Sequence, residues 1–126
     1  MSMKLSVLLA IALAATPVAA GATSPQELAK GKAQFLRCQA CHALLPTDPK
    51  RIGPSLNGII GKPAGKQEGV RYSKGMAEAD FIWTPEKLDE FVKRPREMIP
   101  GTSMVFAGIS DPAARKALIA YMQSIK

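Results

Sequence analysis

The chain has 126 residues, with 17 Lys and Arg against 10 Asp and Glu, a formal net charge of +7 and only 6% aromatic residues. This length suits a single domain, and the basic balance favours acidic partners. No nucleic-acid-binding motif accompanies the charge, so acidic protein surfaces are the better match and nucleic acid is set aside.

Residues 1–20 have the three parts of a secretory signal peptide. Lys4 is the positive n-region, residues 5–15 form the apolar h-region, and residues 17–20 precede a cleavage site. The apolar run is well short of the roughly 20 residues that span a bilayer, so a retained anchor is the weaker alternative. We expect cleavage after Ala20, with Ala22 as the second choice, and an exported domain over residues 21–126 that spans no membrane.

The first helix is predicted from the stretch 24–27, Ser-Pro-Gln-Glu, which is a capping box with proline at the first helical position. It should run to about residue 37, with Leu28, Gly31 and Phe35 along one stripe. A glycine inside a helix costs about 1 kcal/mol relative to alanine. Gly31 therefore indicates the close approach of another helix, the alternative being a glycine that is merely tolerated.

Cys38 and Cys41, followed directly by His42, form the attachment pattern of c-type haem. Each sulfur can add to one vinyl group of the porphyrin, and two intervening residues on a tight helical turn bring both sulfurs to one edge of the ring. The histidine then sits below the ring plane and can bind the iron as its proximal ligand. The chain has no other cysteine or histidine, so no residue competes for these roles.

Three other interpretations of the two cysteines are open. A thioredoxin-like redox motif expects a βαβ setting, and nothing upstream of Cys38 is typical of a strand. Half of a zinc site would have three ligands where a structural site needs four, with no second cluster in the chain. A structural disulfide suits an exported protein unless haem takes the two sulfurs. A haem would also supply apolar volume that the sparse aromatics do not, so we predict that the haem-free chain is poorly folded.

Residues 43–60 should form a loop, because prolines and glycines break both periodicities there. A loop of this length in a small domain is expected to wrap something, here the histidine face of a haem. Pro54 would lie against His42, and its carbonyl could accept the proton on the free imidazole nitrogen, which would hold the ring in one tautomer and orientation.

The rest of the chain predicts helices and no strand of useful length. Residues 61–72 are irregular and basic, and Ser73 can cap a short helix to about residue 79. A clearer helix opens at 84–86, Thr-Pro-Glu, and stops before Pro95. The last helix begins at residue 110 or 111 and runs to about residue 125. The inward positions of these two helices are predicted to be Leu88, Phe91, Val92, Leu118, Tyr121, Met122 and Ile125.

A haem iron bound by His42 needs a sixth ligand or an open site, and the absence of a second histidine excludes bis-histidine ligation. The candidates after the signal peptide are Met76, Met98, Met104 and Met122. Met122 is explained by packing, whereas Met104 lies in an irregular Pro-Gly-containing segment where a surface thioether has little to pack against. Met104 is therefore favoured over Met98. Ligation by methionine and histidine fills both axial sites, which suits passing electrons rather than binding oxygen or peroxide.

The chain resembles the class I cytochrome c family, of the soluble mitochondrial and α-proteobacterial type. The resemblance spreads over nearly all of residues 21–126, and its order and spacing are more specific than any single motif. Its motifs are Gly31 and Phe35 ahead of Cys38-x-x-Cys41-His42; Gly53-Pro54-x-Leu56-x-Gly58; Gly69-x-x-Tyr72-Ser73; Trp83; Ile99-Pro100-Gly101-Thr102-x-Met104-x-Phe106-Ala107-Gly108; and Leu118-Ile119-x-Tyr121.

The resemblance implies an all-α fold in which the first and last helices cross, Gly31 and Phe35 meeting Leu118 and Tyr121, while long loops wrap one covalently bound haem c. It makes Met104 the distal ligand and gives Tyr72 and Trp83 side chains that hydrogen-bond a haem propionate, although a tryptophan such as Trp83, taken alone, is more often just a core residue.

It also implies a periplasmic, monomeric one-electron carrier of the respiratory chain, not an enzyme. Its partners would be acidic surfaces of a cytochrome bc complex, an oxidase, or a periplasmic dehydrogenase or reductase.

Three positions depart from the family pattern. The usual asparagine beneath the haem is Met76, the usual tyrosine near the axial methionine is Phe91, and an arginine common near the propionates is Lys62, which cannot make the bidentate fork. These differences fall in the polar network around Met104 and the propionates, so the resemblance gives no reduction potential. Met76 lies in the haem pocket by this resemblance and is a conceivable rival ligand.

Six cations lie in segments that the family fold would place around the exposed haem edge, where they could form a docking ring: Lys66, Arg71, Lys74, Lys93, Arg94 and Arg96. The alternative is an ordinary solvated surface, because acidic residues are interspersed among them. Two other functions are weighed against the carrier. A peroxidase with an open sixth site lacks an obvious distal acid–base group, and a haem-free thiol oxidoreductase would leave Pro54 and Met104 without a role.

Overall fold

The computed structural model describes residues 12, 14–16 and 21–126. Within these residues the chain forms five helices, and the only β pairing is an isolated bridge between Pro63 and Ile82. No helix in these ranges is long and apolar enough to cross a membrane. Most of the predicted signal peptide, residues 1–11, 13 and 17–20, lies outside the described residues. The all-α fold class is confirmed.

The helices are α1 (Pro25–Phe35), α2 (Lys74–Ala77), α3 (Pro85–Lys93), α4 (Pro95–Met98) and α5 (Pro112–Ser124). Four of them begin as the sequence predicts, because a Ser, Thr or Asp side chain accepts a hydrogen bond from an N–H of the first turn. Both α1 and α2 end about two residues earlier than predicted.

The helix α4 is not predicted. The sequence predicts that the preceding helix stops before Pro95, and it does. Pro95 also occupies the first position of a new short helix, after a break at Arg94, whose φ is −150°.

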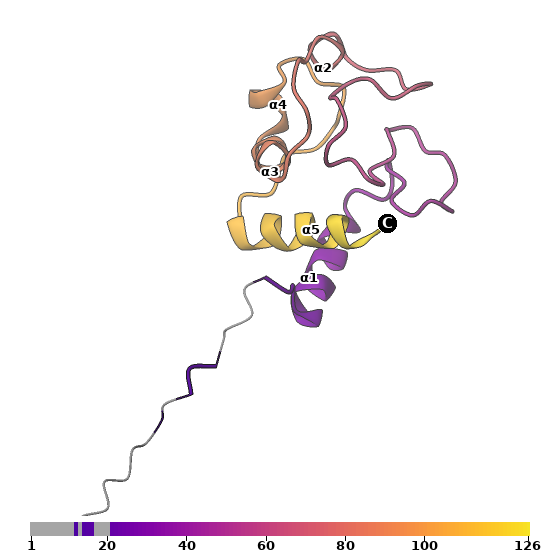
Figure 1. Cartoon of the computed structure of the whole chain (residues 1–126). Coiled ribbons are helices and arrows are strands. Elements are labelled where there is room, and N and C mark those ends of the chain that lie inside the picture. Colours follow the sequence, from indigo (N-terminus) through magenta and orange to yellow (C-terminus); the bar gives the residue numbers. More distant parts are fainter. Residues whose placement is uncertain (1–11, 13, 17–20) are drawn as a thin grey trace, which may run out of the picture.

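The crossing of α1 and α5 is the main helix–helix contact of the fold, and Figure 1 shows α5 lying across α1 with α3 on its other side. At the crossing, a Cβ built on Gly31 would collide with the Ala117 carbonyl and lie 2.5 Å from Tyr121 Cβ. The rings of Phe35 and Tyr121 pack nearby, with centroids 6.1 Å apart. The predicted close approach at Gly31 is confirmed, with Tyr121 at the crossing as expected; the nearest contact is made by the Ala117 backbone, which the sequence does not single out.

A short pairing of two irregular segments positions Trp83. Gly61 N–H donates to Trp83 O at 2.7 Å, and Trp83 N–H donates to Lys62 O at 2.9 Å. The Trp83 ring then packs edge-on against Phe81 and tilted against Phe91, with centroid distances of 4.9 and 5.3 Å. This cluster joins the residues 61–64 to α3 and closes one side of the core.

Candidate functional site

The two cysteines and His42 lie on a tight turn that continues from the end of α1. Cys38 N–H donates to Phe35 O at 2.8 Å, and His42 N–H donates to Cys38 O at 2.9 Å. Both cysteines are free thiols, Cys38 half-buried and Cys41 exposed. The structure therefore has no disulfide between them. Burial raises the pKa of the Cys38 thiol, and the charge of Arg37 offsets that rise only in part.

His42 is held by the carbonyl that the sequence predicts. Its Nδ1 lies 2.7 Å from Pro54 O, and because a carbonyl can only accept, Nδ1 carries the proton. The neutral ring then has its lone pair on Nε2, the atom needed to bind a metal. Burial lowers the pKa of His42, against the opposing effect of the Pro54 hydrogen bond, and so favours this neutral form.

Gly53 brings the loop against the face of the imidazole, a role that the sequence does not single out. A Cβ at this position would lie 2.7 Å from His42 Cε1 and 2.8 Å from Cys41 O. The same residue donates its N–H to Cys41 O at 2.7 Å, and Leu56 N–H donates to Ala43 O at 2.8 Å. Only glycine leaves room for this approach; its place directly before Pro54 is the signal that could have found it.

Asp48 orders the first part of the same loop. Its Oδ2 accepts from the N–H groups of Leu44 and Leu45, both at 2.9 Å. These hydrogen bonds hold the pKa of the Asp48 carboxyl below its usual range. The segment after His42 is thereby closed into a compact turn, which the count of prolines and glycines alone does not reveal.

Of the four methionines considered, Met76 and Met122 are buried at 8% and 4% exposure and belong to the apolar core. Met98 and Met104 are both half-buried against that core. Met104 lies on the irregular segment between α4 and α5, where its N–H donates to Thr102 Oγ1 at 3.3 Å. Burial thus sets Met76 apart as a core residue and does not by itself separate Met98 from Met104.

Tyr72 and Trp83 are placed differently. The Tyr72 hydroxyl accepts from Gln67 N–H at 3.3 Å, which leaves its own proton free to donate. Trp83 is buried against Phe81 and Phe91, so the core alone explains much of its environment. Lys62, at the position where the resemblance expects an arginine, donates from its ammonium to Asn57 O at 2.9 Å.

These residues fit a c-type haem. Two free thiols with two residues between them and a neutral imidazole with Nε2 unengaged form the donor set that such a group requires. Gly53 keeps side-chain atoms away from the imidazole. A structural zinc site is not supported, because the described residues contain no cluster of three or more His, Cys, Asp or Glu side chains able to hold a metal.

Comparison with known proteins agrees with this chemistry. The family model described as Cytochrome c matches residues 28–126. A cytochrome c2 of Agrobacterium tumefaciens (strain II Chrys) is 44% identical over 99 residues, which cover 76% of this chain and 89% of that protein. A cytochrome c2 of Blastochloris viridis is 36% identical over 116 residues, covering 92% of this chain and 87% of that protein.

A solved structure gives the same answer for the fold. Cytochrome cH from Methylobacterium extorquens superposes with a TM-score of 0.71 at 34% identity, covering 77% of this chain and 97% of that chain. The chain therefore belongs to the cytochrome c family, as an electron carrier with covalently attached haem c rather than an enzyme.

Proposed function

We propose that this electron carrier works in the periplasm with both axial positions of its haem iron filled, by His42 and Met104. The observation that carries the proposal is the 2.7 Å hydrogen bond from His42 Nδ1 to Pro54 O, in a chain with no second histidine. It presents Nε2 in a fixed orientation, and the loop around Gly53 keeps that orientation. The haem, when bound, supplies an iron that cycles between its ferric and ferrous states.

The other residues hold and orient the group. Cys38 and Cys41 anchor the porphyrin through thioether bonds, so that it cannot be lost after export. Tyr72, whose hydroxyl proton is free, and Trp83 are the proposed donors to a haem propionate, since a carboxylate in an apolar pocket needs hydrogen-bond donors. Pro54 acts through His42 as its hydrogen-bond acceptor.

Carbon monoxide distinguishes this carrier from a haem enzyme with an open site. We expect the ferrous protein to show no change in its visible spectrum under carbon monoxide at neutral pH, because Met104 occupies the position that the gas would take. Met104→Ala should bind carbon monoxide readily, and Met98→Leu should behave like the parent. A parent protein that binds carbon monoxide at once would contradict the closed site and favour the peroxidase alternative.

We propose that acidic redox proteins dock on the basic face formed by α4 and the segment after it. A cleft of about 440 Å³ opens there between residues 94–97 and 105–107, next to Val105, which is 91% exposed. The six predicted cations are all exposed, but they are not equally available. Lys66 donates to Ala77 O, Lys74 lies 3.9 Å from Glu78 and Arg94 lies 3.1 Å from Glu97.

In the described part of the chain, Arg71, Lys93 and Arg96 have no acidic partner within salt-bridge distance. Electron transfer from a cytochrome bc complex, or to an oxidase, should therefore slow about tenfold between ~10 and ~150 mM salt. Arg96→Gln should lower the low-salt rate several-fold and lose that effect at high salt, while Lys116→Gln on α5 should change neither. A stopped-flow rate that does not change across this range of salt concentration would contradict electrostatic steering of the partner by this basic face.

The exported location rests on the sequence of residues 1–20 and on the relatives being bacterial cytochromes c2. We propose that cleavage after Ala20 releases a monomer of residues 21–126, whose net charge falls to +6 before the haem propionates are counted because Lys4 is removed.

A further inference from the structure

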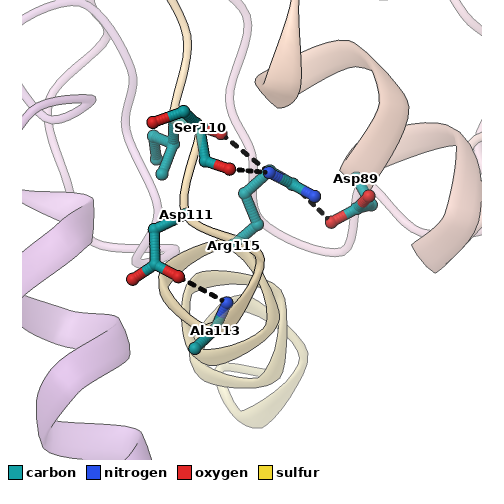
Figure 2. Close-up of polar contacts among 6 residues, drawn as sticks. Asp89, Ser110, Asp111, Ala113 and Arg115 are labelled. Atoms are coloured by element: carbon teal, nitrogen blue, oxygen red, sulfur yellow. Dashed lines mark hydrogen bonds and ion pairs between the residues drawn. The ribbon is translucent and has the colours of Figure 1, made fainter.

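Arg115 is the one buried charged residue in the described part of the chain, with 5% of its surface exposed. It lies in the first turn of α5, and Figure 2 shows its side chain reaching between Asp89 on α3 and the backbone at Ser110. Its Nε donates to Asp89 Oδ1 at 2.8 Å, and its Nη1 donates to the carbonyls of Ile109 and Ser110, both at 2.9 Å. One guanidinium thus joins α3, α5 and the chain segment between α4 and α5.

The connector, residues 99–111 between α4 and α5, contains Met104. At its start, Thr102 N–H donates to Ile99 O at 3.1 Å and Met104 N–H donates to Thr102 Oγ1 at 3.3 Å. Through its middle it has few hydrogen bonds: of the described ones, residues 105–108 make only that from Phe106 N–H to Met104 O, at 3.2 Å, and Phe106 packs against the core. Met104 therefore depends on how firmly the far end of the connector is held.

The far end is held from two sides. Ile109 N–H donates to Val92 O at the end of α3, at 2.9 Å, while the Ile109 carbonyl accepts from Arg115. Gly108 lies so close to α3 that a Cβ there would collide with the Lys93 carbonyl and lie 3.2 Å from Val92 O. Because Gly108 has a φ of +106°, a side chain at this position would be strained as well.

We infer that Arg115 is a positioning residue for the axial methionine: by holding the Ile109 and Ser110 carbonyls, it sets how far the connector can move and so how often Met104 leaves the iron. This inference rests on the proposed ligation by Met104. Without the Arg115 side chain, the two carbonyls and Asp89 lose their shared donor. The far end of the connector then retains the Ile109–Val92 hydrogen bond and the contacts of Asp111 with the first turn of α5, and neither of these holds the Ile109 and Ser110 carbonyls.

The test is the rate at which excess imidazole replaces Met104 in the oxidised holoprotein, followed by loss of the methionine-to-iron absorption band. Arg115→Met removes all three hydrogen bonds and keeps an apolar stem, and we expect it to accelerate capture about tenfold. Arg115→Lys keeps a cation for Asp89 but loses the paired carbonyl contact, and it should fall between. Asp89→Asn leaves both carbonyl contacts in place and should stay within about twofold of the parent.

The matched control is Phe35→Leu, which weakens the α1–α5 packing at Tyr121 away from the connector. At equal loss of global stability, faster capture in the Arg115 variants than in Phe35→Leu supports a positioning role; equal capture overturns it. If Arg115→Met yields no holoprotein, the comparison of Arg115→Lys with Asp89→Asn decides, and equal rates overturn the inference. A parent protein without the methionine band would instead remove Met104 from the iron and overturn the proposed ligation itself.

Discussion

Replacing both Cys38 and Cys41 by alanine is expected to give an exported chain with no covalent haem and little fixed structure. The thioether bonds have no other attachment point, because the sequence contains no further cysteine. The described core is small and has few aromatic side chains, so folding should depend on the group that it surrounds, as metal-dependent domains depend on their metal.

This prediction is checked by haem staining on a denaturing gel and by far-ultraviolet circular dichroism of the same samples. The matched control is Gln39→Ala, an exposed change between the two cysteines, which should keep full staining and helicity. A double variant with native-like helicity and a cooperative unfolding transition would show that the chain folds without its cofactor.

Gly31→Ala should destabilise the holoprotein by about 2–3 kcal/mol, although alanine is the better helix former by about 1 kcal/mol. The added Cβ would collide with the Ala117 carbonyl, and that atom belongs to the backbone of α5, which cannot turn away as a side chain could. The helices must separate, and the Phe35–Tyr121 contact beside the crossing weakens with them.

Guanidinium chloride unfolding of the holoprotein measures this difference. Lys32→Ala, next to Gly31 in α1 but exposed, is the control and should stay within about 0.5 kcal/mol of the parent. If Gly31→Ala is as stable as the parent, the close helix crossing is not what this glycine provides.

The features that the sequence predicts well are those written in short-range patterns. Each of four helices begins after a capping residue: Ser24, Ser73, Thr84 or Asp111. The sequence predicts these starts because a capping side chain and the N–H group that donates to it are only two or three residues apart. Gly31 indicates the helix crossing because a costly glycine inside a helix needs a reason. The Pro54 carbonyl follows from the Cys-x-x-Cys-His pattern and a loop that must return to the histidine.

The features that the sequence does not predict depend on contacts between distant residues. Arg115 looks like one more basic residue on the last helix, and nothing in its spacing pairs it with Asp89, 26 residues earlier. The resemblance places Lys66 among the cations of a docking ring, and it does not reveal that the Lys66 ammonium donates to the carbonyl of Ala77. Pro95 predicts the end of one helix, and the sequence around it does not show that the same proline begins the next, although proline favours the first turn of a helix.

The most direct test of the ligation by His42 and Met104 is the visible absorption spectrum of the exported, oxidised protein. Ligation by His42 and Met104 predicts a low-spin ferric haem with a weak methionine-to-iron band that disappears in Met104→Ala and remains in Met98→Leu. A high-spin spectrum without that band in the parent protein would contradict it, and a band that is lost in Met98→Leu instead would assign the sixth position to Met98.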